Sequence, residues 1–269
     1  MAQLPISSAA VRRLLGEIDS SGSGEHLLAL GGSSEPAAEL RQQFLRGRAD
    51  PAAVRLGGPE RADAYVHVLA GEPSVEDDGV LRRAKRARVP VIAVAPENVE
   101  IAYVVATDIV RVGAGESFPL EEIAQAIAAR LGEDGAPLAA RVPLLREAVC
   151  DQLIASFSRK NGLFAAAVWI PGVDLPVLTL NQLRLVLRLA QAYGVDDVRE
   201  RLPELAATVG AGFGLRALAQ ELLDLVPVAG WALKGAVAYG GTRALGEAAR
   251  QRFSLAAKLP PAAAAPVAP

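Results

Sequence analysis

The chain has 269 residues, enough for two domains of ordinary size, and its formal net charge is −2, from 30 acidic and 28 basic residues. This balance provides no global field that would attract a polyanion, so we predict no binding to nucleic acid and only local recognition of a charged partner. Cys150 is the single cysteine, and the chain has two histidines. An internal disulfide is therefore excluded, and we predict no metal site and no bound cofactor.

The N-terminal half, residues 1–135, alternates between short apolar segments and helical patterns. Such alternation is typical of a parallel sheet covered by helices on both faces, with right-handed crossovers. A first amphipathic helix is predicted at the N-terminus, where no secretory signal occurs, so we expect an intracellular protein. Strands are predicted at 26–30, 64–69, 89–95 and 109–112. After the first helix, three more helices are predicted at 36–46, 75–88 and 119–131.

The C-terminal half lacks strand signals. Residues 132–136, Gly-Glu-Asp-Gly-Ala, interrupt the apolar periodicity and predict a linker between the domains. An all-helical domain is expected over 141–255, and its Pro- and Ala-rich continuation, 256–269, is predicted to be a disordered tail. Helices are expected at 144–157, 176–193 and 197–207, with one or two more over 210–252.

The turn after the first predicted strand, residues 31–36, stands where a phosphate-binding loop would read G-x-x-x-x-G-K-[ST]. It contains no lysine, Pro36 removes an amide donor, and Glu35 would repel a triphosphate. We therefore favour a closed structural turn. Weak nucleotide binding is the alternative, and it would use Gly31, Gly32, Ser33 and Ser34.

Two later turns also lack the residues of a GTPase. Residues 70–73 and 95–98 stand where a GTPase would carry its magnesium-binding and guanine-reading motifs, and they contain neither motif. Their carboxylates, Glu72 and Glu97, are predicted to be exposed. The chain contains no nucleophile elbow and no dinucleotide fingerprint, and His67 lies in the middle of a predicted strand, so no catalytic triad is expected. We therefore predict that the protein is not an enzyme.

A basic run, residues 81–88, ends the helix that begins near Val75. We interpret it as a solvated helix face that the acidic first turn of the same helix balances. An acidic partner or lipid headgroups are the alternative.

The helical half contains two long apolar stretches, 161–183 and 225–242. They permit either a soluble or peripherally attached bundle, rich in small residues, or segments inserted in a membrane. Polar residues are set among these apolar neighbours. They predict an internal network that fixes the helix register, with a pocket or partner surface as the alternative, and they are Asp174, Asn181, Gln182, Arg184, Lys234, Tyr239 and Thr242.

The order of motifs in this half resembles a bacterial helical domain of unknown function, the YcjF-like family, that is often fused behind GTPase domains. The resemblance covers about 141–253 and rests on the runs at 170–174, 192–194, 226–230 and 245–246. It implies that the family's polar positions are Asp174, Gln182, Tyr193, Lys234, Tyr239 and Thr242. It also implies membrane association and an Era-like GTPase domain over the N-terminal half.

Together these features predict an α/β, P-loop-GTPase-like domain with a parallel sheet, followed by an all-α domain. The expected function is that of a non-catalytic regulatory or scaffold protein, located in the cytoplasm or at the cytoplasmic face of the inner membrane. A protein partner is expected, such as an intact GTPase, and a homo-oligomer is an open possibility. The alternatives are an atypical nucleotide-binding switch and a membrane-embedded structural protein.

Overall fold

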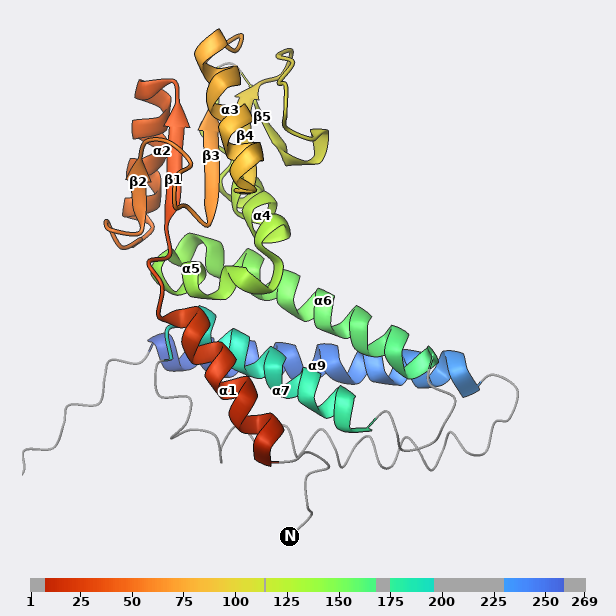
Figure 1. The fold of residues 1–269 in the computed structure, drawn as a ribbon. Coiled ribbons are helices and arrows are strands. Elements are labelled where there is room, and N and C mark those ends of the chain that lie inside the picture. Colours follow the sequence, from red (N-terminus) through yellow and green to blue (C-terminus); the bar gives the residue numbers. More distant parts are fainter. Residues whose placement is uncertain (1–7, 114, 168–174, 196–229, 259–269) are drawn as a thin grey trace, which may run out of the picture. The chain divides into compact units, whose positions relative to one another are not determined.

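A computed structural model describes residues 8–113, 115–167, 175–195 and 230–258 (Figure 1). The chain divides into two compact units, which are described separately below. The larger unit is Arg12–Ser156, and the other combines Met1–Val11 with Phe157–Pro269. The larger unit contains a parallel sheet flanked by helices, which confirms the predicted α/β class.

The sheet has five strands, all parallel, in the order β2-β1-β3-β4-β5. This is one of the two common orders of doubly wound sheets, and the direction of winding reverses between β1 and β3. In such sheets the crevice at the carboxyl ends of the two strands at the reversal is where ligands bind. The strands are β1 (Leu28–Gly32), β2 (Val54–Leu56), β3 (Ala64–Val68), β4 (Val91–Pro96) and β5 (Ile109–Val112).

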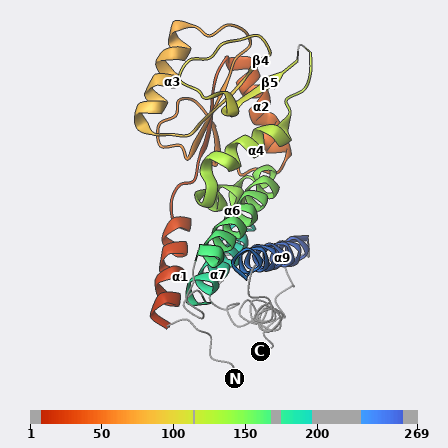
Figure 2. The same cartoon turned by 90° about the vertical axis from the view of Figure 1, so that its right-hand side faces the viewer.

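Helices cover both faces of the sheet, with α3 on one side and α2 and α4 on the other (Figure 2). Side chains alternate along each strand, so Ala29 and Tyr65 pack with Ala84 of α3, while their neighbours Leu28 and Val66 are buried on the opposite face. This unit contains the helices α1 (Ser8–Gly22), whose first residues belong to the other unit, α2 (Ser34–Arg46), α3 (Val75–Ala87) and α4 (Leu120–Leu131), and the 3-10 turn η1 (Ala106–Asp108) before β5. Its remaining helical segments are described below.

Four of the five strands coincide with predicted strands to within two residues at each end. The exception is β2, which the sequence analysis missed. It has only three residues, and a charged side chain, Arg55, lies at its centre, so neither a long apolar run nor a clear alternation marks it.

The predicted linker at 132–136 is folded and belongs to the larger unit. It forms a 3-10 turn, η2 (Gly132–Gly135), and the start of α5 (Ala136–Arg141), which η3 (Pro143–Leu145) and α6 (Arg146–Ala167) follow. Arg141 fixes α5 to the amino edge of the sheet: its guanidinium donates to Asp50 Oδ2 (2.7 Å) and to the carbonyl oxygen of His26 (2.9 Å). The division between the two compact units falls within α6.

The second unit is built from the C-terminal part of α6, α7 (Leu175–Ala192) and α9 (Gly230–Lys258). α6 and α9 cross closely, because a Cβ placed on Gly235 would lie 3.0 Å from the carbonyl oxygen of Gly162. A second contact joins the helices where Ala165, Leu178 and Ala238 pack together. The predicted helix at 197–207 and residues 259–269 of the predicted tail lie outside the described residues, and 256–258 continue α9.

The two apolar stretches are only partly described, since 168–174 and 225–229 lie outside the described ranges. Among the helices that the structure does describe, none has both the length and the hydropathy needed to cross a bilayer.

Candidate functional site

A cavity of about 600 Å³ opens at the carboxyl edge of the sheet, where the winding reverses between β1 and β3. Its walls are formed by β1, β2 and β3 and the loops after them, by the first turn of α2, and by α3 as far as Arg83. The cavity brings together the four residues predicted for weak nucleotide binding. Its polar and glycine lining consists of Gly31, Gly32, Ser33, Ser34, Gly57, Gly58, Tyr65, His67, Ser74, Glu76, Asp77 and Arg83.

Three side chains of the wall form a hydrogen-bonded line. Tyr65 and His67 are two residues apart on β3, so both point to the α3 side of the sheet, and both are buried. The Tyr65 hydroxyl donates to His67 Nδ1 (2.9 Å), and His67 Nε2 donates to Asp77 Oδ1 (2.9 Å). Each imidazole nitrogen therefore has one partner, as a neutral histidine requires.

Asp77 is held in place by the start of α3. Its second oxygen, Oδ2, accepts hydrogen bonds from the backbone amide of Ser74 (2.8 Å) and from the Ser74 hydroxyl (2.6 Å). The amide of Asp77 donates in return to Ser74 Oγ (3.2 Å), which completes a capping box. The sequence Ser-x-x-Asp at 74–77 thus both begins the helix and orients the carboxylate toward His67.

The protonation states follow from burial and from these bonds. Burial lowers the pKa of His67, against the opposing charge of Asp77, and burial together with that charge raises the pKa of Tyr65. Burial alone would raise the pKa of Asp77, but the bonds from Ser74 and the neighbouring His67 outweigh it and lower this pKa. The line therefore consists of a protonated phenol, a neutral imidazole and an ionised carboxylate at neutral pH.

The loop after β1 is a closed turn, as predicted. Gly32 has φ +94°, and a Cβ there would overlap the carbonyl oxygen of Val68, so only glycine fits. The amide of Ser33 donates to the Val68 carbonyl oxygen (2.8 Å), and Ser33 Oγ accepts from the amide of Ala70 (3.0 Å). Both loop carboxylates that were predicted to be exposed, Glu72 and Glu97, are exposed.

The sequence analysis named no partners for His67, and the structure aligns its ring with Tyr65 and Asp77. The expectation that the chain has no catalytic triad stays a prediction. Two signals were present in the sequence. Two polar rings two residues apart on a buried strand need partners, and a capping-box aspartate at the start of the next helix supplies one.

Four polar side chains of the helical unit form a second network. Asn161 Nδ2 of α6 donates to Thr242 Oγ1 of α9 (2.9 Å), and Gln182 Nε2 of α7 donates to the same oxygen (3.3 Å). Asn181 Nδ2 donates to Asn161 Oδ1 (2.9 Å). These bonds join all three helices, as the register-fixing interpretation predicts for Asn181, Gln182 and Thr242. Asn161 had not been predicted as a member.

Three of the other polar positions that the resemblance implies lie within the described residues, and they are Tyr193, Lys234 and Tyr239. The Tyr193 ring lies 6.2 Å from that of Phe253, and the Tyr239 hydroxyl accepts from Arg243 Nη1 (3.4 Å). Lys234 is partly exposed, and Asp174 lies outside the described residues.

A second hollow of about 480 Å³ lies along α4, η3 and the start of α6, and it is lined by Glu121, Glu147 and Asp151. In the described parts of the chain no group of three histidine, cysteine or acidic side chains is placed to hold a metal ion. Comparison with protein-family models, with curated proteins and with solved structures found no match to this chain.

Proposed function

We propose that the chain is a non-catalytic regulatory or scaffold protein whose α/β unit binds a small, neutral molecule rich in hydroxyl groups. The observation that carries this proposal is the cavity at the carboxyl ends of β1 and β3, with the Tyr65–His67–Asp77 line in its wall. A doubly wound sheet binds its ligands at this position.

The charges of the lining favour a neutral ligand. Glu76 and Asp77 face one cation, Arg83, and the described lining residues include no lysine. A triphosphate would meet net negative charge there, and the closed turn at Ser33 already uses its amide within the protein. Hydroxyl groups on the ligand would instead pair with Ser34, Ser74 and the remaining lone pair of the Tyr65 hydroxyl.

The state of Tyr65 favours binding over catalysis. A nucleophilic or basic tyrosine needs a lowered pKa, whereas burial raises the pKa of this phenol. His67 has a bonded partner on each ring nitrogen, so it has no free lone pair with which to take a proton from a ligand. His67 and Asp77 therefore serve to fix the direction of the Tyr65 hydroxyl.

The relation to Era-like GTPase domains is a further part of the proposal, and it rests on the resemblance over 141–253. The resemblance suggests that an intact GTPase or another protein partner detects whether the α/β unit has bound its ligand. It also suggests peripheral attachment at the cytoplasmic face of a membrane.

Titration calorimetry of the full chain tests the proposal, with ribose, adenosine and guanosine as neutral probes and GTP, GDP and ATP as charged ones. We expect at least one neutral probe to bind and the Tyr65→Phe substitution to weaken it about tenfold or more, the effect of a lost polar contact. Tyr239→Phe, which removes a tyrosine hydroxyl outside the cavity lining, is the matched control. Micromolar binding of a nucleoside triphosphate, or no binding of any neutral probe, would contradict the proposal.

A further inference from the structure

Helix α3 carries five exposed cations: Arg82, Lys85 and Arg86, Arg83, which also lines the cavity, and Arg88 at the C-cap. Within the described residues none of the five forms an ion pair with a carboxylate. The acidic first turn does not neutralise them by contact, because Asp77 is bound to Ser74 and His67. The cations are exposed, as the interpretation of a solvated helix face predicts, and they are not paired with the acidic first turn.

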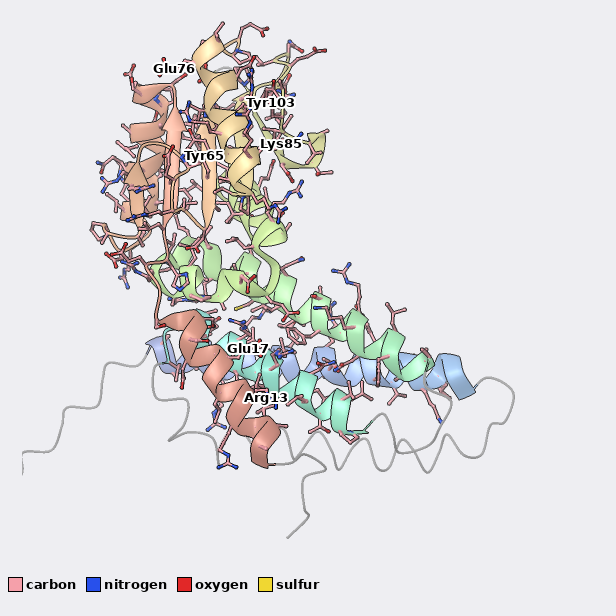
Figure 3. The ribbon with its side chains drawn as sticks, in the orientation of Figure 1. Arg13, Glu17, Tyr65, Glu76, Lys85 and Tyr103 are labelled. Carbon is pink, nitrogen blue, oxygen red and sulfur yellow. The ribbon has the colours of Figure 1, made fainter. Side chains whose placement is uncertain are left out.

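An aromatic side chain from another segment lies against this cluster. The loop after β4 places the ring centre of Tyr103 5.4 Å from Arg82 Cζ and 5.8 Å from Lys85 Nζ, so both cations interact with the ring. Figure 3 shows Lys85 and Tyr103 on the same side of the unit. Tyr103 has φ +69° and is 42 % exposed, and Val105 beside it is 55 % exposed. We call Arg82, Lys85, Arg86 and Tyr103 the α3 basic face.

We infer that the α3 basic face is a docking surface for an acidic segment of a protein partner. Guanidinium groups bind carboxylates with two parallel hydrogen bonds, and exposed Tyr and Arg side chains together are typical of the residues that contribute most to protein interfaces. The exposed apolar surface of Tyr103 and Val105 suits a partner that excludes water from part of the contact.

The net charge of the chain favours this partner class over an extended polyanion. Proteins that bind nucleic acid or anionic bilayers through electrostatics usually present a strongly basic domain, whereas this chain has a net charge of −2. A short acidic peptide needs only local complementarity, which three cations and one aromatic ring supply. The inference does not depend on the ligand of the cavity.

Fluorescence polarisation with a labelled ten-residue polyglutamate peptide tests this surface on the full chain. We expect salt-sensitive binding that the double substitution Arg82→Glu/Arg86→Glu weakens about tenfold or more. The control is Arg12→Glu/Arg13→Glu, the same charge change on exposed positions of α1. It should weaken binding less than threefold.

Two milder variants separate recognition from loss of structure. Arg82→Gln/Arg86→Gln should give an intermediate loss, and Tyr103→Asn, which tolerates the positive φ, should weaken the peptide severalfold with unchanged circular dichroism. The inference is wrong if the peptide does not bind or if both charge reversals have the same effect. Tighter binding to phosphatidylserine vesicles or to single-stranded DNA than to the peptide would also overturn it.

Discussion

Each unit of the molecule buries a polar network, and the two networks differ in what surrounds them. The Tyr65–His67–Asp77 line of the α/β unit contains titratable groups and borders a cavity of about 600 Å³. The network around Thr242 consists of amides and a hydroxyl and lies where three helices meet, beside the close contact of Gly162 and Gly235. Both satisfy buried polar groups, and the first also faces a cavity that a ligand can enter.

The largest expected effect is at the glycine that closes the cavity wall. Gly32→Ala should lower the free energy of unfolding by roughly 3–5 kcal/mol, because its φ of +94° strains any side chain and its Cβ would overlap the Val68 carbonyl. Urea denaturation measures this loss. Gly115→Ala, which combines positive φ with open space around its Cβ, is the control and should cost about 1 kcal/mol. Equal losses in the two variants would exclude the backbone contact as the cause.

The next largest effect is expected in the helical network. Thr242→Val keeps the shape of the side chain but leaves the amides of Asn161 and Gln182 without their shared acceptor, at a cost of about 2–3 kcal/mol. Thr242→Ser keeps the hydroxyl and should lose less than half as much. If Thr242→Val is as stable as the wild type in urea denaturation, the network does not hold these helices in register.

The corresponding change beside the cavity should cost less. Tyr65→Phe removes one hydrogen bond to His67 Nδ1, but water in the cavity can replace the lost partner, so we expect a loss of about 1 kcal/mol or less. The same denaturation experiment gives this value. A loss as large as that of Thr242→Val would show that the two networks have the same structural role.

The pH dependence of stability also distinguishes the networks. Because burial lowers the pKa of His67 below its ordinary 6.5, the unfolded chain takes up this proton first as the pH falls. Stability should therefore decrease as the pH falls below about 6.5, and Asp77 should add a further loss below its ordinary 3.8. Denaturation midpoints between pH 8 and pH 5 measure the first effect. This decrease in stability should disappear in the His67→Gln variant and persist in the Thr242→Ser variant.

Much of the fold follows from the sequence, whereas the arrangement of the site follows only in part. The apolar runs around Leu30, Val66 and Val94 predict buried strands, because the core of a parallel sheet needs apolar side chains on both faces. The turn at 31–36 was predicted to be closed, and Ser33 closes it through hydrogen bonds to Val68 and Ala70. The missed parts depend on long-range contacts. α5, which begins at Ala136, is bonded to the amino edge of the sheet through Arg141, Asp50 and His26, and no local pattern reveals these contacts.

The central claim is that the network beside the cavity presents a hydroxyl to a ligand and that the helical network is structural. The most direct test is a calorimetric titration of Tyr65→Phe and Thr242→Val with whichever neutral probe binds the wild-type chain. We predict that Tyr65→Phe loses binding about tenfold or more while staying folded, and that Thr242→Val keeps wild-type affinity in spite of its lower stability. Wild-type affinity in Tyr65→Phe, or equal losses in both variants, would contradict the account.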